Sequence, residues 1–342
     1  MNRAAPLCSF RYQLAQATIF HPAVQVAIGI WITAYAVVLM LAHGRLPFDR
    51  PAVAELPFAL QLAAPTAGMI EIFLLMAVVF ALTRRRELPD ITARAPDRRT
   101  AMTETLALLG YAAVGQAGGW ILGPLLGCRP FSFHIAGTLF GHREPPPPRE
   151  LWTWAIYNFV VFAVIPYVAS RRRYSDTQLN LRSTNRGNDL VVIVVICILE
   201  SGFELGAFNA GILSLSPHQL LLGVPLSLFF YGIGTVLPTM VLIYAILIPR
   251  FLKLTGSMVT TTLLGGLTYS SMHLVEGWSN FSSTRNVALS LIFVLLNYLG
   301  PGIFKSFVTL RTGNAWVHAI GYHAIAPHVI IDTPLLVRAF RL

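Results

Sequence analysis

The sequence has little charge and a high apolar content. Only 12% of its 342 residues are charged, whereas 55% are hydrophobic. Soluble domains carry roughly 25% charged residues, so a water-soluble globule of this length would have too few charges for its surface. The apolar content also excludes a disordered, low-complexity chain. The class that remains is an integral membrane protein, in which an ionisable side chain inside a span is a functional candidate.

Cysteine and acidic residues are also scarce. The three cysteines, Cys8, Cys128 and Cys197, form neither a CxxC motif nor a disulfide framework, and we interpret them as packing residues. The chain holds 15 Asp and Glu against 25 Lys and Arg. Basic cytoplasmic loops of membrane proteins produce such an excess, so no nucleic-acid partner is implied. Residues 1–20 lack the pattern of a cleaved signal peptide, and the first span is expected to direct insertion.

Long hydrophobic runs recur along the whole chain. Because a bilayer-crossing helix needs about 20 apolar residues, the sequence predicts about nine spans, with an error of about one. The predicted fold class is therefore all-α, a polytopic integral membrane bundle of about 8–9 transmembrane helices. The seventh span is short, and Pro225, Pro238 and Pro249 are expected to kink or break the sixth. The predicted spans are Ala23–Ala42, Leu56–Leu82, Leu106–Leu126, Leu151–Ser170, Leu190–Leu213, Leu220–Ile248, Met258–Met272, Val287–Ile303 and Ala315–Leu336.

Basic residues gather on alternate loops. Arginine runs occupy residues 84–86 and 171–173, Arg250 follows the sixth predicted span, and Lys305 follows the eighth. The positive-inside rule places these loops and the N-terminus in the cytoplasm of a multi-pass protein, expected in a bacterial plasma membrane. The polar stretch at 174–189 divides the chain into an N-terminal membrane region, residues 1–188, and a C-terminal region, residues 189–342.

The C-terminal region concentrates histidines. His318, His323, His328 and Asp332 follow one another at spacings of five, five and four residues. On an α-helix His328 and Asp332 share a face, whereas His318 and His323 point about 140° apart. One straight helix therefore cannot aim all four groups at one point. Pro327 is expected to disturb the helix and to redirect His328.

Acids accompany histidines elsewhere in the predicted spans. His273 and Glu276 share a helical face, and Glu200 and Glu204 lie one turn apart in the fifth span. Such acids must be protonated, paired or hydrated. Histidine nitrogens and carboxylate oxygens together suit zinc, which lowers the pKa of its water to ~7. The alternative is that these histidines form hydrogen bonds between helices. Glu71 is interpreted as a packing or snorkelling acid.

Two short motifs carry a resemblance to a known family. Tyr269 to His273 reads YSSMH, and a later stretch reads TGNAWVHAIGYHAIAPH. Residues 237–331 resemble the CPBP family, the CAAX-protease and bacteriocin-processing group of intramembrane metallo-endopeptidases. Members carry EExxxR, FxxxH and HxxxN or HxxxD on separate spans. The resemblance places His273 on the second motif, with Tyr269 for Phe, and His323 on the third.

The chain departs from the family pattern at two places. Pro327 stands four residues after His323, where the family has Asn or Asp. The span at 234–257 should carry the glutamate motif but has no acid, and Glu200 and Glu204 lie one span upstream. In the family the glutamates activate the attacking water. Either an acid from another helix replaces them, or the fold persists without the activity.

The leading hypothesis is a zinc-dependent intramembrane endopeptidase that cleaves membrane-embedded or lipid-anchored peptides. The alternatives are a catalytically inactive family member that binds partners or confers immunity within the bilayer, and a proton-coupled transporter using Glu200, Glu204 and His273. The oligomeric state does not follow from the sequence. The leading hypothesis assigns His273, His323, His328 and Asp332 to the metal, and Glu200, Glu204 and Glu276 to catalysis.

Overall fold

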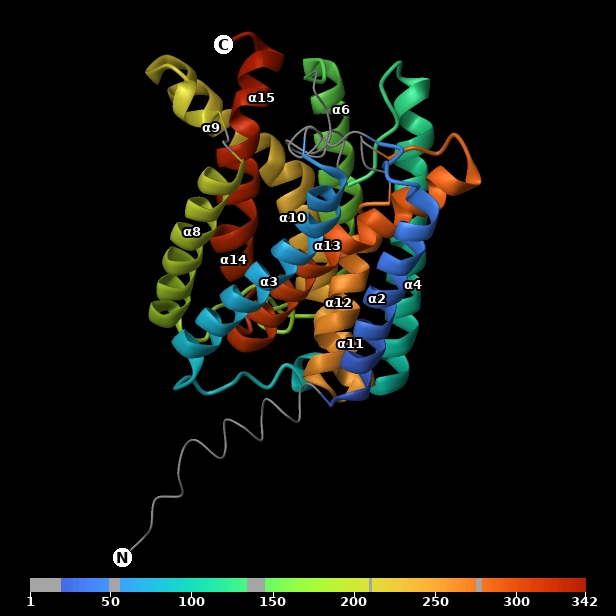
Figure 1. The fold of residues 1–342 in the computed structure, drawn as a ribbon. Coiled ribbons are helices and arrows are strands. Elements are labelled where there is room, and N and C mark those ends of the chain that lie inside the picture. Colours follow the sequence, from blue (N-terminus) through green and yellow to red (C-terminus); the bar gives the residue numbers. More distant parts are fainter. Residues whose placement is uncertain (1–19, 49–55, 134–144, 209–210, 275–278) are drawn as a thin grey trace, which may run out of the picture.

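The protein is an all-helical bundle. The computed structural model describes residues 20–48, 56–133, 145–208, 211–274 and 279–342. Helix makes up 79% of the structure, and the described residues contain no strand. Eight helices are long and apolar enough to cross a membrane, and they pack side by side (Figure 1). The chain is therefore an integral multi-pass membrane protein, which confirms the predicted fold class.

The N-terminal half supplies four of these spans. Their positions agree with the hydrophobic runs, except that the third begins well before the predicted Leu106. The fourth is one continuous helix with a wider central turn, so three segments share one span. The elements are α2 (Pro22–Ala42), α3 (Phe58–Thr83), η1 (Thr92–Arg94), α4 (Arg98–Leu125), α6 (Pro148–Asn158), η2 (Phe159–Val164) and α7 (Ile165–Arg171).

The C-terminal half holds longer and more interrupted helices. The fifth span ends earlier than the predicted Leu213, and the eighth continues past the predicted Ile303. The elements are α8 (Arg186–Phe208), η3 (Ile212–Ser214), α9 (Pro217–Tyr231), η4 (Gly232–Val236), α10 (Leu237–Thr239), η5 (Met240–Leu247), α11 (Ile248–Thr255), α12 (Met258–Ser271), α13 (Thr284–Thr312), α14 (Ala315–His318), η6 (Ala319–Ile330) and α15 (Ile331–Phe340).

Helix α12 is the short seventh span that the sequence predicts. Its 14 residues rise about 21 Å, less than the ~30 Å of the hydrocarbon core. It returns from the end of α11 toward the middle of the bundle (Figure 1). Among the described residues it adds a short ninth segment to the eight long spans, which agrees with the predicted 8–9 helices. Accordingly, α2 begins at one end of the bundle and α15 finishes at the other (Figure 1).

The wide-turn segments η2, η4, η5 and η6 are π-helical, and each contains or closely precedes a proline. The prolines are Pro166, Pro238, Pro249 and Pro327. Proline lacks the N–H that would bond the carbonyl four residues earlier, and its ring crowds that turn. A widened turn with i to i+5 hydrogen bonds relieves the crowding. The chain therefore stays helical at Pro238 and Pro249 and does not break there, which leaves a kink as the alternative of the prediction that a continuous helix permits.

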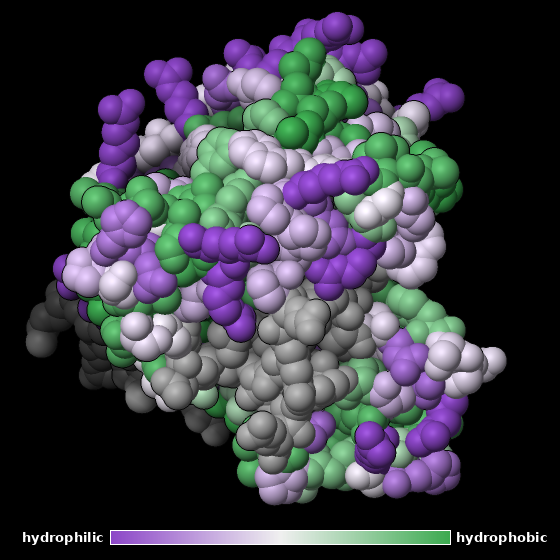
Figure 2. Space-filling model, turned by 90° about the horizontal axis from the view of Figure 1, so that it is seen from above, coloured by the Kyte–Doolittle hydropathy of each residue, from purple (hydrophilic) through white to green (hydrophobic). Residues whose placement is uncertain are grey.

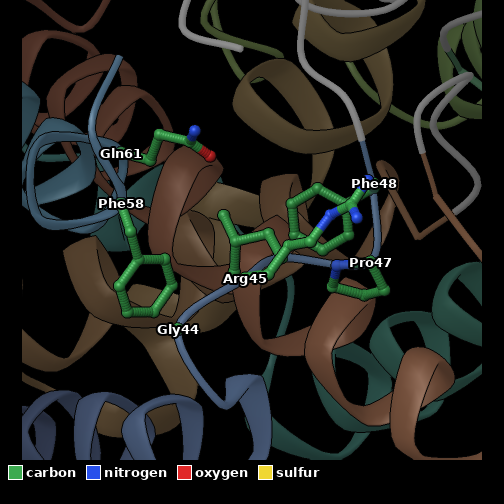
Figure 3. A pocket seen from close by; sticks show the side chains of 7 residues that line it. Gly44, Arg45, Pro47, Phe48, Phe58 and Gln61 are labelled. Carbon is green, nitrogen blue, oxygen red and sulfur yellow. The ribbon is translucent and has the colours of Figure 1, made fainter. Parts of the chain in front are cut away.

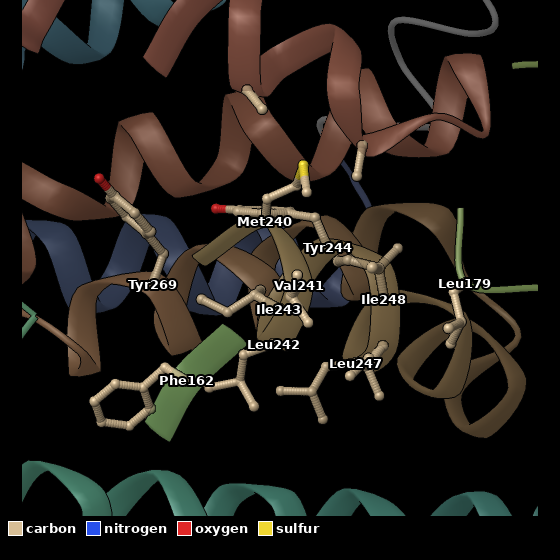
Figure 4. Packing of buried hydrophobic residues seen from close by; sticks show 14 of the residues in the cluster. Phe162, Leu179, Met240, Val241, Leu242, Ile243, Tyr244, Leu247, Ile248 and Tyr269 are labelled. Carbon is tan, nitrogen blue, oxygen red and sulfur yellow. The ribbon is translucent and has the colours of Figure 1, made fainter. Parts of the chain in front are cut away.

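The most buried part of the bundle surrounds η5. Every residue of Met240–Leu247 is buried, and Phe162 and Tyr269 pack in the same cluster (Figure 4). The last span is also central, because 72% of its apolar window lies inside the protein, against 6% for α2. α2 thus faces lipid, while η5 and the last span form the centre of the molecule.

The two ends of the bundle are polar. At one end Arg86 donates hydrogen bonds to Asp189 and to the carbonyl of Thr312, and Asn314 Nδ2 donates to Asp189 at 2.8 Å. These bonds join the ends of α3, α8, α13 and the start of α14. The opposite end, at which α15 finishes, is seen in Figure 2, where hydrophilic side chains cover much of the surface with hydrophobic ones among them.

Candidate functional site

Two sequence-predicted histidines meet at one tyrosine. Tyr269 lies near the end of α12, and its hydroxyl is 3.4 Å from Nε2 of His323 on η6. The ring of His273 lies 4.4 Å from the Tyr269 ring, measured between centres. Both histidines are buried, with 0% and 2% of their surfaces exposed. The structure therefore brings α12 and η6 together around Tyr269, although the two motifs lie 54 residues apart.

The π-helical segment brings a further histidine beside His323. The ring centres of His323 and His328 lie 5.1 Å apart. α-Helical spacing would separate two residues five apart by about 140°. The i to i+5 hydrogen bonds of η6 instead place such residues on neighbouring turns. Two imidazoles that share a tetrahedral zinc have ring centres about 5 Å apart, because each Zn–N bond is ~2.0–2.1 Å.

Hydrogen-bond partners fix the tautomers of His273 and His328. His273 Nδ1 lies 2.7 Å from the carbonyl oxygen of Tyr269, which can only accept, so Nδ1 carries the proton. His328 Nδ1 lies 2.9 Å from Asp332 Oδ2 and donates to it in the same way. In both neutral rings Nε2 is therefore the acceptor nitrogen.

His323 has the same tautomer. The Thr239 hydroxyl donates to the carbonyl of Thr235 at 2.8 Å, so its one proton is already used. The bond to the carbonyl is the shorter one, so toward His323 Nδ1, at 3.4 Å, the favoured role of that hydroxyl is to accept. His323 therefore donates a hydrogen bond from Nδ1, and its Nε2 accepts one from the Tyr269 hydroxyl. All three histidines thus offer Nε2, the nitrogen that a metal ion or an acidic proton would bind.

His318 takes no part in this group. It lies on α14, 4.2 Å from the Tyr244 ring between centres, and is 1% exposed. Its ring nitrogens have no hydrogen-bond partner among the described residues, and it interacts electrostatically with Lys305. His318 therefore belongs to the packed surroundings of Lys305 rather than to the Tyr269 group.

The predicted catalytic acids Glu200 and Glu204 form a different cluster. Glu200 shares a carboxyl–carboxyl hydrogen bond with Glu71 of α3, and Glu204 faces the same two groups. Lys305 interacts with Glu200 and also lies 3.7 Å above the ring of Tyr269. Tyr322 of η6 faces all three acids. Lys305 and Tyr322 thus connect the acids to the histidine group.

Sequence reasoning missed Glu71 and Lys305. The prediction that Lys305 follows the eighth span is wrong, because α13 continues to Thr312 and Lys305 is fully buried within it. The apolar residues on both sides of Lys305 are the sequence signal that could have placed it inside the span. Glu71 is an acid in the middle of a predicted span, but the sequence does not show that α3 packs against α8. Its partner was therefore not predictable from the pattern alone.

No preformed metal group is present in the part of the chain that the structure describes. There, no three His, Cys, Asp or Glu side chains are close enough together to hold a metal ion. Glu276, predicted beside His273, lies outside the described residues. The donor set nevertheless fits zinc chemically, since it combines imidazole Nε2 acceptors with a carboxylate that holds the far nitrogen of His328.

Pockets at the protein surface lie away from this group. One of about 440 Å³ is formed by the chain after α2 and the start of α3, with Arg45, Phe48 and Phe58 in its lining (Figure 3). Another, of about 350 Å³, lies between Tyr167 and Trp316. Neither pocket includes a residue that the sequence assigns to the metal or to catalysis.

Comparisons with known proteins add no assignment. No protein-family model, no curated protein and no solved structure matches this chain. The geometry of Tyr269, the three histidines and the acid cluster is therefore what indicates the chemistry of the site.

Proposed function

We propose that this chain is a zinc-dependent intramembrane peptidase of CPBP type, which cleaves membrane-embedded or lipid-anchored peptides. The observation that carries the proposal is the common tautomer of His273, His323 and His328. Each ring donates from Nδ1 to a protein oxygen and offers Nε2. The proposal includes a bacterial plasma membrane. It also includes a cytoplasmic N-terminus, because the arginine runs at 84–86 and 171–173 follow the positive-inside rule.

The three histidines and Asp332 have distinct roles in this proposal. His323 and His328 are metal ligands on one segment, η6, and His273 is a ligand from the turn that follows α12. Asp332 accepts from His328 Nδ1 and so holds that ring in the orientation and tautomer that zinc needs. Bound zinc would supply Lewis acidity that activates water at neutral pH and polarises a peptide carbonyl.

Nearby side chains favour negative charge at the same place. The Tyr269 hydroxyl donates toward His323, and the Lys305 Nζ lies above the Tyr269 ring. Preorganised donors and cations stabilise the charge that develops on a carbonyl oxygen during hydrolysis. Glu200 interacts with Glu71 and Lys305, and Glu204 interacts with Glu71; neither acid is paired with a histidine of this group, so they have no proton transfer in the proposed reaction. Glu276 remains a prediction from its spacing to His273.

Zinc content tests the proposal directly. The full chain is purified in lipid nanodiscs, loaded with zinc, washed with a weak chelator and analysed by elemental mass spectrometry. We expect stoichiometric zinc in the wild type and in His218→Ala, which removes an exposed histidine at the start of α9. We expect its loss in His323→Ala and in His328→Ala.

Cleavage of lipid-anchored peptides by the loaded protein tests the second half of the proposal. We expect cleavage products from the wild type and none from His323→Ala. A wild type that retains no zinc contradicts the metal site. Stoichiometric zinc without cleavage of any peptide overturns the peptidase assignment and favours a binding or immunity protein.

A further inference from the structure

Three carboxyl groups interact where α3 packs against α8. Glu71 and Glu200 share a hydrogen bond, and Glu204, one turn further along α8, faces both. Two ionised carboxylates have no proton to share, so a carboxyl–carboxyl hydrogen bond requires that one of them be protonated. The contact between Glu71 and Glu200 therefore requires a bound proton.

Lys305 provides a second, independent observation. It is 0% exposed, and its Nζ has no hydrogen-bond partner among the described residues. It interacts with Glu200 and lies 3.7 Å above the Tyr269 ring. A cation buried away from water needs a compensating charge, and cation–π contact alone supplies only part of it. The acid cluster is the source of that compensating charge.

The charges of this group do not balance without a ligand. Three ionised carboxylates and one ammonium would leave an excess negative charge in the membrane core, where uncompensated charge is strongly unfavourable. The oxygens Glu71 Oε1, Glu200 Oε2 and Glu204 Oε2 are buried and have no amine, amide or hydroxyl partner among the described residues. A metal cation would replace the hydrogen bond between Glu71 and Glu200, whereas protons preserve it. The contact favours protons as the ligand.

We propose that Glu71, Glu200, Glu204 and Lys305 form a proton-binding site in the membrane core, which keeps Lys305 charged and holds two protons on the three carboxyls. With one ammonium and one carboxylate the group is neutral. The site adjoins the histidine group through Lys305 and Tyr269, but it contains none of the proposed zinc ligands and does not depend on zinc.

Glu204 is the member through which protons exchange with water. Glu204 lies four residues, or about one helical turn, before Phe208, the last residue of α8. Its exposed fraction is 8%, against 3% for Glu200. Glu71 is more exposed than either, but it lies in the middle of α3, at the depth of the lipid. The α8 end near Glu204 is the end at which α9 begins (Figure 1). Protons therefore enter and leave from that side of the membrane.

The elements packed around the site contribute uncharged neighbours. η6 contributes Tyr322, which faces all three acids. α14 contributes His318 and α12 contributes Tyr269, and both face Lys305. None of these side chains is a permanent cation, so Lys305 and the bound protons are what neutralise the acids.

Infrared spectroscopy of the full chain in nanodiscs tests the proposal. Protonated carboxyl groups absorb apart from carboxylates, and their band shifts in D2O. We expect this band in the wild type at neutral pH and about half of it in Glu71→Gln, Glu200→Gln or Glu204→Gln, since each variant removes one of two protons. Glu87→Gln, which removes an exposed loop acid, is the matched control and should leave the band unchanged.

Lys305→Met gives the opposite expectation. Without the ammonium, neutrality needs a proton on every carboxyl, so the band should increase to about 1.5 times its wild-type intensity. An unchanged band in this variant overturns the assignment of two protons beside a charged lysine.

The wild type alone also decides the question, even where a variant does not fold. A wild type without the protonated-carboxyl band at neutral pH overturns the proton site. Loss of the band on addition of NaCl at constant pH identifies a sodium site instead. A band that is insensitive to sodium and disappears at alkaline pH supports the proton site, and zinc removal should not affect it.

Discussion

Individual side chains determine the chemistry of the core through the hydrogen bonds that they accept. Asp332 and the Tyr269 carbonyl each fix a histidine by accepting from Nδ1, and Thr239 does so because its own proton is already donated. A hydroxyl that cannot donate toward an imidazole has the same effect on its tautomer as a carbonyl. Thr239, which belongs to neither sequence motif, therefore favours the His323 tautomer whose Nε2 can bind a metal ion.

Asp332→Asn tests the orientation of His328. The amide has the shape of the carboxyl group but is a weaker, uncharged acceptor for Nδ1. If His328 binds zinc, we expect zinc affinity to fall roughly 10–100-fold, as for other residues that hold a metal-binding histidine. Competition titration with a chromogenic chelator measures the change. Asp176→Asn, in an exposed ion pair, is the control, and equal affinities in the two variants would contradict the role of Asp332.

Close packing of neighbouring helices brings Tyr269 and Lys305 into contact. α12 and α13 approach closely because glycines face each other: a Cβ on Gly302 would lie 2.7 Å from Tyr269 Cβ and 2.8 Å from Gly266 Cα. Small residues permit such close helix packing within a membrane. This approach also places Lys305, one turn along α13, against the Tyr269 ring.

Gly302→Ala should separate α12 from α13. The added methyl group overlaps atoms of two residues that cannot move without displacing α12, so we expect a loss of about 1–3 kcal/mol in the free energy of unfolding. Gly68→Ala, where nothing lies within 4 Å of the new Cβ, should not be destabilised. Unfolding in mixed micelles measures both, and equal stability of the two variants would refute close packing at Gly302.

Arg86 and Asp189 connect the ends of three helices. Both side chains are nearly inaccessible, with 3% and 5% exposed, and Asp189 also accepts from Asn314. Because Arg86→Ala leaves Asp189 buried without its cation, we expect destabilisation of about 3–5 kcal/mol. Arg171→Ala breaks an exposed pair with Asp176 and should cost only about 0–1 kcal/mol. A similar loss in both variants would show that burial of the Arg86 pair contributes nothing.

At the scale of the whole molecule, the number and positions of the spans follow from the thickness of a bilayer. Hydrophobic run length located the spans, including the short α12, because hydrocarbon requires about 20 apolar residues per crossing. Pro327 predicts that the helix is disturbed near His328, but a proline does not specify how its helix adjusts, so the π-helical turns of η6 are not predictable from the sequence. A hydropathy pattern predicts that Lys305 lies after its span because it treats a buried lysine as a boundary. Its partners lie on α8 and α12, and a linear pattern does not record which helices pack together.

If α12 completes a ninth pass, the loop after α7 and the end of α15 lie on opposite sides of the membrane. Thr177→Cys and Arg341→Cys, each made in a chain whose native cysteines are replaced by serine, introduce exposed thiols at these two places. A membrane-impermeant maleimide added to intact cells should label Arg341→Cys, and Thr177→Cys should react only after lysis. Labelling of both thiols from one side would show an even number of passes.

The shortness of α12 has a further consequence for the surrounding lipid. A helix of 14 residues is about 9 Å shorter than the hydrocarbon core. Hydrophobic mismatch of this kind is relieved by local thinning of the bilayer or by tilt, at a cost that rises with membrane thickness. The residues around Tyr269 therefore lie closer to water in short-chain lipids than in long-chain ones. Acyl-chain length is thus a physical variable to which both polar groups of this protein should respond.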